Sequence, residues 1–264
     1  MRYFPGTFCW VGLAASDPEV AKTFYGGLFG WEFRDRAASG IGSFATAVRG
    51  SQAVALLYGQ TAEARAAGVL PHWTAFLSVD DADRAAARAS ELGGSMVRDS
   101  FDVGDLARVA TVRDPSGAIV SLWEPRVASG AEARGAVGSL GWNELSTPDP
   151  EHAATFYTEL LDWRCTVKGS SIVIRHAGVV VGVIREQLAD ERRQAPNWLP
   201  CFGVDDLDAA RRTATAFGGR VLGREADTGS PLGARTIRIE DLLRARFSVA
   251  EHRDEILRTR SPPS

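Results

Sequence analysis

A chain of 264 residues suits two domains of roughly 100–150 residues each, and its net charge of −3 lacks the basic excess that nucleic-acid backbones require. No apolar run approaches the roughly 18 residues needed to span a bilayer, and the first residues lack a signal-peptide pattern. Three cysteines (Cys9, Cys165 and Cys201) form neither a zinc set nor a disulfide framework, which predicts reduced thiols in a cytoplasmic protein.

The most informative feature is a segment that occurs twice. Trp10–Trp31 (WVGLAASDPEVAKTFYGGLFGW) returns as Trp142–Trp163 (WNELSTPDPEHAATFYTELLDW), 132 residues later. In each copy an alternating stretch indicates a strand, and Asp-Pro-Glu begins a helix of about three turns with Asp as the N-cap. A repeat at this long period predicts a duplicated domain.

The remaining elements follow in the same order in both halves. In the first half we expect strands at 44–48 and 53–58, a connection at 59–69, a strand at 73–79, a helix at 82–92, and strands near 95–98, 107–113 and 118–123. In the second half a hairpin at 171–175 and 179–184 comes first, and Val204-Asp205-Asp206 then matches Val79-Asp80-Asp81. The prediction is an α+β fold of four β-α-β-β-β modules, with domains at 6–125 and 137–252, a linker at 126–136 and a flexible tail at 253–264.

These motifs resemble a known family. The repeated D-P-E-x-A-x-x-F-Y-x-x-L-x-x-W unit, the V-D-D helix start and the turn Asp114-Pro115-Ser116-Gly117 are similar to those of the vicinal oxygen chelate superfamily. This group includes glyoxalase I, bleomycin-resistance proteins and extradiol dioxygenases, and the chain looks most like its two-domain glyoxalase-like members from actinobacteria. The resemblance covers residues 6–251. It implies two cup-shaped mixed sheets, each able to hold a metal, a substrate or a drug.

The same resemblance locates the family's metal ligands on inward-facing strand positions. Here those positions carry Trp10, Thr74 and Ser121 in the first domain and Trp142, Leu199 and Ser248 in the second, with the remaining ligands expected near 56–58 and 183–185. None of the six is a usual metal ligand, and neither window supplies a histidine or a carboxylate. We therefore expect no metal and no other cofactor.

Aromatic side chains dominate the strands that would form the cups. Trp10 and Trp142 stand where relatives keep a ligand, and planar rings there suit stacking on a flat molecule. Such rings also fill protein cores, so a purely structural role stays open for each. The expected ligand contacts are Trp10, Phe44, Tyr58, Trp73, Phe76, Trp123, Trp142, Glu144, Arg175 and Trp198.

Two further residues carry alternatives. Glu144 faces the second cup, either in a salt bridge with Arg175, Arg185 or Arg246, or as a polar anchor or proton acceptor. His72 lies at the mouth of the first cup, as a rim residue or as a general base.

The leading functional hypothesis is metal-independent binding of an aromatic or amphipathic small molecule. Binding would sequester a drug or present a natural-product intermediate to a biosynthetic enzyme, by analogy with bleomycin-resistance proteins. The alternative is a cofactor-free enzyme with Glu144 or His72 as acid or base, and a metal-dependent lyase, isomerase or dioxygenase is the third hypothesis. We expect no nucleic-acid or membrane partner, and a monomer or weak homodimer because the two domains pair within one chain.

Overall fold

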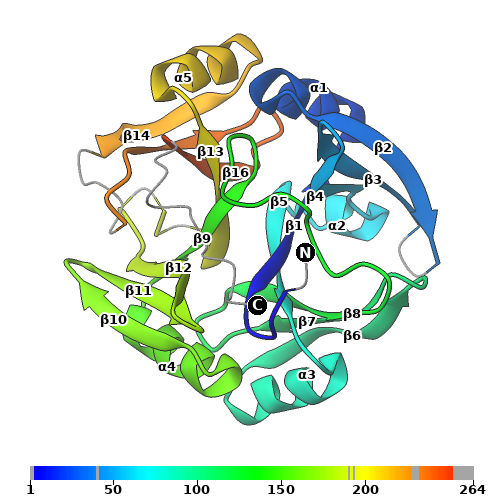
Figure 1. Cartoon of the computed structure of the whole chain (residues 1–264), viewed down its shortest axis with the longest axis vertical. Coiled ribbons are helices and arrows are strands. Elements are labelled where there is room, and N and C mark those ends of the chain that lie inside the picture. The colour runs from blue at the N-terminus through cyan, green and yellow to red at the C-terminus, as the bar shows by residue number, and fades with distance from the viewer. Residues whose placement is uncertain (1–2, 40–41, 190, 193, 227–231, 252–264) are drawn as a thin grey trace.

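The computed structural model describes residues 3–39, 42–189, 191–192, 194–226 and 232–251. They form two eight-stranded mixed sheets with equivalent strand order, and the longer helices lie at the periphery (Figure 1). Each half runs β-α-β-β-β twice, which confirms the expected α+β fold of four modules. The expected tail at 253–264 lies outside the described residues. None of the described helices is long and apolar enough to cross a membrane.

The first sheet has the strand order β2-β3-β4-β1-β5-β8-β7-β6. Its strands are β1 (Phe8–Ala15), β2 (Glu32–Ala38), β3 (Gly42–Arg49), β4 (Gln52–Gly59), β5 (His72–Ser78), β6 (Ser95–Val103), β7 (Ala107–Arg113) and β8 (Ile119–Pro125). Its helices are α1 (Pro18–Phe29), α2 (Ala62–Ala66) and α3 (Ala82–Glu91).

The second sheet repeats this arrangement as β10-β11-β12-β9-β13-β16-β15-β14. Its strands are β9 (Leu140–Thr147), β10 (Arg164–Lys168), β11 (Ser171–His176), β12 (Val179–Glu186), β13 (Asn197–Val204), β14 (Arg220–Ala226), β15 (Thr236–Glu240) and β16 (Arg246–Glu251). Its helices are α4 (Pro150–Leu161) and α5 (Leu207–Ala216).

The repeated segment builds the same local structure in both halves. The Asp17 carboxylate accepts hydrogen bonds from the first backbone N–H groups of α1, and the Asp149 carboxylate accepts one at the start of α4. Both helices end on a left-handed residue, Gly30 with φ of 69° and Asp162 with φ of 53°. The same capping chemistry therefore determines both ends of these helices.

One short helix was not expected. The connection at 59–69 contains α2, a single turn whose N-cap is Thr61, and the Thr61 hydroxyl accepts a hydrogen bond from the Ala64 N–H at 3.1 Å. A threonine followed by an alanine-rich stretch is a helix start signal, but so short a helix depends on tertiary contacts.

Side chains that point away from the cups join the two domains. One buried cluster links α1, β1 and β4 of the first domain with α5, β15 and β16 of the second. Another links α3, β5 and β8 with α4, β9 and β12. Helices α1 and α5 consequently lie side by side, as do α3 and α4 (Figure 1). Each domain thus completes the hydrophobic core of the other.

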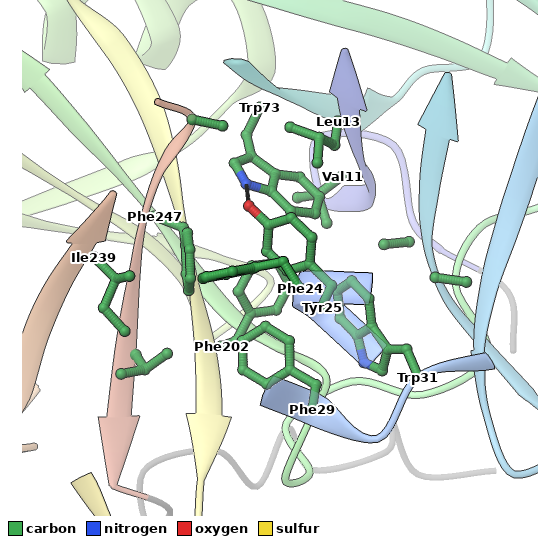
Figure 2. Packing of buried hydrophobic residues seen from close by; sticks show 14 of the residues in the cluster. Val11, Leu13, Phe24, Tyr25, Phe29, Trp31, Trp73, Phe202, Ile239 and Phe247 are labelled. Atoms are coloured by element: carbon green, nitrogen blue, oxygen red, sulfur yellow. Dashed lines mark hydrogen bonds between the residues drawn. The ribbon is translucent and has the colours of Figure 1, made fainter. Parts of the chain in front are cut away.

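A hydrogen-bonded chain of aromatic residues crosses each of these clusters. In the first, the Trp73 indole N–H donates to the Tyr25 hydroxyl at 3.1 Å (Figure 2), and this hydroxyl donates to the Asp241 carboxylate of the other domain at 2.9 Å. Burial, followed by the charge of Asp241, raises the pKa of Tyr25 well above its usual value. The Trp31 indole also crosses the boundary, where it donates to the Gly138 carbonyl at 2.7 Å.

The second cluster contains the same series of hydrogen bonds, with the roles of the two domains exchanged. The Trp198 indole donates to the Tyr157 hydroxyl at 2.8 Å, and the hydroxyl donates to Asp114 at 3.0 Å. The other carboxylate oxygen of Asp114 accepts the N–H groups of Ser116 and Ala118, which shapes the turn before β8. A single aspartate thus holds a turn of one domain and a tyrosine of the other.

The segment at 126–136, expected to be a linker, connects the two sheets but packs closely against the first. The Ala131 N–H donates to the Cys9 carbonyl at 2.9 Å, and the Tyr3 hydroxyl donates to the Ala131 carbonyl at 2.8 Å. The Trp123 indole N–H donates to the Ala128 carbonyl at 2.8 Å. This connection is therefore part of the first domain's wall.

Removing one hydroxyl from the domain contact should destabilise the whole chain. In Tyr157→Phe the buried Asp114 carboxylate and Trp198 N–H lose their shared partner, so we expect the free energy of unfolding to fall by about 2 kcal/mol. Urea-induced unfolding measures this as a lower midpoint. Tyr58→Phe, at a half-buried tyrosine outside the domain contact, is the control, and an equal loss there would contradict the special role of Tyr157.

Candidate functional site

The first domain encloses a cavity of about 890 Å³ on the concave face of its sheet. A volume of this size lies within the range of small-molecule sites. Its aromatic lining consists of Trp10, Phe44, Tyr58, Phe76, Phe101 and Trp123. Its uncharged polar lining includes Thr46, Gln60, Thr74, Thr111 and Ser121. The cavity is therefore mainly apolar, with hydroxyl groups spread over its wall.

Strand register explains how these side chains converge. Trp10 of β1 lies opposite Phe76 of β5, and Phe76 lies opposite Ser121 of β8. Neighbouring strands are about 4.8 Å apart, and alternate residues of a strand share a face. One row of the sheet therefore places an indole, a phenyl ring and a hydroxyl side by side.

Gly12 allows two rings to close over the centre of the sheet. A Cβ atom at this position would lie 2.9 Å from Tyr58 Cε1 and 3.0 Å from Phe76 Cε2, so the two rings would have to move apart to admit it. Burial raises the pKa of the Tyr58 hydroxyl, while its hydrogen bond with Thr74 acts in the opposite direction. Tyr58 is thus a neutral hydroxyl in the cavity wall at physiological pH.

The positions at which the family resemblance implies metal ligands contribute to this cavity. They carry Trp10, Thr74 and Ser121, and the window 56–58 adds Leu56 and Tyr58 to the lining. An indole, an isobutyl group, two aliphatic hydroxyls and a neutral phenol do not form the set of imidazole, carboxylate or thiolate donors that a divalent metal needs. Within the described ranges no group of three or more His, Cys, Asp and Glu side chains could hold a metal ion. The residues at these positions do not fit a metal.

His72 is an exposed residue in the lining at the start of β5. Its Nδ1 atom lies 2.9 Å from the Leu70 carbonyl oxygen. A carbonyl can only accept, so this contact places the proton of the neutral ring on Nδ1. The lone pair of Nε2 is then available as a hydrogen-bond or proton acceptor at the rim.

Trp73, Trp198 and Arg175, three of the expected ligand contacts, lie away from the first cavity. Trp73 and Trp198 belong to the two buried clusters between the domains, where their indoles bind tyrosines. Successive residues of a strand face opposite sides of a sheet, so Trp73 cannot share a face with its neighbour Thr74. Arg175 is exposed on β11 of the second domain.

The second cup contains Trp142 and Glu144, and it differs from the first in holding a network of charged side chains among its described residues. Glu144 accepts a hydrogen bond from Arg185 Nε at 2.6 Å, which is one of the salt bridges that the sequence offered. Arg185 and Arg238 each approach the carboxylate of Glu191 to 2.6 Å. Trp142 is buried beside this network in an apolar cluster with Val183 and Cys201.

The two cups can be compared position by position through strand register. Glu144 takes the position of Gly12, because each pairs with the equivalent residue of the neighbouring strand, Val183 or Leu56. Arg185 takes the position of Tyr58 in the same way, since they pair with Ser146 and Ala14. Thr111 likewise corresponds to Arg238, since each lies opposite the matching serine of the last strand. Glycine, tyrosine and threonine in the first cup are thus replaced by glutamate and two arginines in the second.

Glu191 and Arg238 were not expected in the second cup, and neither were Arg36, Phe101 and the 126–136 segment in the first. Glu191 stands in a charge-dense run of a loop, where a solvated side chain is the usual outcome. Matching the registers of the two halves would have located Arg238, but no local pattern indicates that a loop residue turns inward.

Because of the ion network, the free energy of unfolding should decrease as the pH falls into the acid range. Burial acts to raise the pKa of Glu191, but the hydrogen bonds and charges of Arg185 and Arg238 outweigh it and lower the pKa to about 2. Because the pKa of Glu191 is lower in the folded chain than its unfolded value of about 4.3, the ionised carboxylate stabilises the fold above that pH. This stabilisation is lost as the pH falls toward 2.

We therefore expect Glu191→Gln to unfold more easily than the native chain above pH 5, by on the order of 2–3 kcal/mol. The difference should shrink between pH 5 and pH 2, which urea unfolding at several pH values would measure. A difference that is the same at pH 6 and pH 3 would contradict the assignment. Glu186→Gln, at an exposed neighbour paired with Arg192, provides the control.

Comparison with known proteins agrees with this fold. Residues 7–122 match the model of the Glyoxalase/Bleomycin resistance protein/Dioxygenase superfamily, and residues 143–238 match that of a glyoxalase-like domain. The fold resembles a Mn(II)-bound glyoxalase from Novosphingobium aromaticivorans, with a TM-score of 0.64, 13% identity, and coverage of 94% of this chain and 83% of that one. It also resembles the 2,3-dioxygenase LapB from Pseudomonas sp. KL28, with a TM-score of 0.63, 12% identity, and coverage of 92% and 91%.

Relatives of higher sequence identity span nearly the whole chain. The putative glyoxylase CFP32 of Mycobacterium tuberculosis is 33% identical over 237 residues, which cover 87% of this chain and 89% of the relative. The anthracycline biosynthesis protein DnrV of Streptomyces peucetius is 32% identical over 271 residues, which cover 96% of both. The chain therefore belongs to the glyoxalase/bleomycin resistance protein/dioxygenase superfamily, the vicinal oxygen chelate group, as a protein of two tandem domains.

Proposed function

We propose that the protein binds a flat aromatic small molecule in the cavity of its first domain, without a metal. The observation that carries this proposal is the aromatic cavity of about 890 Å³ at the family's metal positions. The Trp123 ring meets the rings of Trp10 and Phe76 edge to face, with centroid distances of 6.4 and 5.8 Å. Rings fixed in this way bury a planar ligand at little cost in side-chain entropy.

The names of relatives favour a polycyclic ligand. Two of them, from Streptomyces peucetius and Streptomyces sp. (strain C5), are named for the biosynthesis of anthracyclines, which are planar polycyclic aromatic compounds. In the proposed role the chain sequesters such a molecule or presents it to a biosynthetic enzyme. The wall supplies neutral hydroxyls, including Thr74, Thr111 and Ser121, that match the carbonyl and hydroxyl groups of these compounds.

One ligand per chain is the expected stoichiometry. The second cup holds the Glu144–Arg185 pair, at the positions of Gly12 and Tyr58 in the first cup, and the buried carboxylate of Glu191. Placing a ligand there would break at least one buried ion pair, which is strongly unfavourable.

A cofactor-free enzyme is the second candidate, and the geometry of His72 favours it. The imidazole lines the cavity and keeps Nε2 as the acceptor, so it can take a proton from an acidic hydroxyl or C–H group of a bound molecule. Glu144 lies in the other cup and is paired with Arg185, so the base in this mechanism is His72.

Replacing Trp10 should test the binding site directly. We expect Trp10→Leu to weaken binding of methyl anthraquinone-2-carboxylate by roughly tenfold, because one stacking surface is lost. Tryptophan-fluorescence quenching and calorimetry measure the affinity. Trp142→Leu changes the matching residue of the second cup and should leave the affinity unchanged. Equal losses in both variants would contradict the assignment of the site to the first cup.

Mass spectrometry of the ligand after incubation separates binding from catalysis. Under the leading proposal the ligand is recovered unchanged. If it is converted, and His72→Asn abolishes conversion while it spares binding, the enzymatic candidate replaces the binding one. Glu144→Gln is the matched carboxyl variant, and it should change neither binding nor conversion.

A further inference from the structure

Charged groups around the first cavity are distributed unevenly. Two arginines contribute to the lining, Arg36 from β2 and Arg98 from β6, the two edge strands of the sheet. Glu132 is the single carboxylate among the described lining residues. The aromatic rings lie on the strands between these edges, so the cavity has an apolar centre and a guanidinium group at each edge.

Glu132 is already engaged at a different part of the wall. Its carboxylate accepts the backbone N–H of Ala53 at 2.8 Å, at the start of β4. Arg36 lies in the row of Phe44 and Tyr58, near the opposite end of β4. The negative charge therefore does not neutralise Arg36.

Arg36 has no ion pair within the described parts of the chain, although acidic residues stand nearby. The adjacent Asp35 is bound to Lys22 of α1 at 2.7 Å, on the other face of β2. His72 lies in the same cross-strand row as Arg36, at its far end, and adds a second polar group of basic character. Arg98 stacks on the Phe101 ring at 3.8 Å and extends the aromatic wall with a cation.

We infer that the ligand of this cavity is an acidic aromatic compound, with its rings against Trp10 and Phe76 and its carboxylate or ionised hydroxyl against Arg36. This inference rests on the proposed binding function and narrows its ligand class. A guanidinium beside an aromatic wall recognises an anion through charge-assisted hydrogen bonds. A ligand that carries an ammonium group at that end meets the like charge of Arg36 instead.

Three matched probes test the charge preference. Anthraquinone-2-carboxylate, its methyl ester and 2-(aminomethyl)anthraquinone share one ring system and differ in charge. We expect the acid to bind about tenfold more tightly than the ester, and the amine most weakly. Raising the salt concentration from about 50 mM to about 500 mM should weaken binding of the acid and leave the ester unchanged, because only the charged pair is screened.

Arg36→Gln should remove the preference. In this variant the acid should lose its tenfold advantage over the ester, so that the two bind equally. Arg34→Gln is the matched control, since Arg34 lies two residues away on the same edge strand and is not part of the cavity wall. It should retain the full preference for the acid.

The outcomes distinguish this inference from the function on which it rests. If ester and acid bind the native chain equally, or the amine binds best, the acidic ligand class is wrong but the aromatic cavity stands. If Arg34→Gln and Arg36→Gln lose the preference alike, the anion is not held at Arg36. If none of the three probes binds, the proposed binding function itself is overturned. Should Arg36→Gln fail to fold, the salt dependence of the native chain tests the charge preference in its place.

Discussion

The structure depends on a hydrogen bond that each domain makes to the other. A tyrosine of the repeated helix donates to an aspartate in the last turn of the opposite domain, at 2.9 Å for Tyr25 and Asp241 and at 3.0 Å for Tyr157 and Asp114. Because the hydroxyl, the indole that donates to it and the carboxylate are all buried, separating the domains would leave several polar groups without partners. The contact therefore fixes the pairing of the two sheets, and with it the shape of the first cup.

This constraint explains which residues the two halves share. Phe-Tyr and the final tryptophan of the repeated segment serve the domain contact, so both copies need them. Asp241 persists although its turn lacks the proline and glycine found after Asp114, because its carboxylate still holds the turn through Leu243 and Ala245 and accepts Tyr25. The cups lie on the other face of each sheet, and their residues are free to differ.

Local patterns in the sequence were sufficient for the fold but only partly for the site. Capping aspartates, period-two strands and the long repeat predicted the four modules because these signals act within a few residues. Alternation along a strand places Trp10 in the first cup and turns Trp73 away from it. Predicting which face Trp73 takes requires the register of β5, because the composition of the strand does not reveal it. Glu191 could not be predicted, since its inward position depends on arginines that the fold brings from β12 and β15.

The difference between the two cups begins at one position of the central strand. Gly12 leaves room for the rings of Tyr58 and Phe76 to close over β1, whereas Glu144 introduces a carboxylate that must be paired once it is buried. Arg185 meets that need, and its own charge draws in Glu191, which Arg238 in turn balances. A buried charge at the centre of the sheet thus leads to an ion network in the second cup, and its absence leaves an apolar cavity in the first.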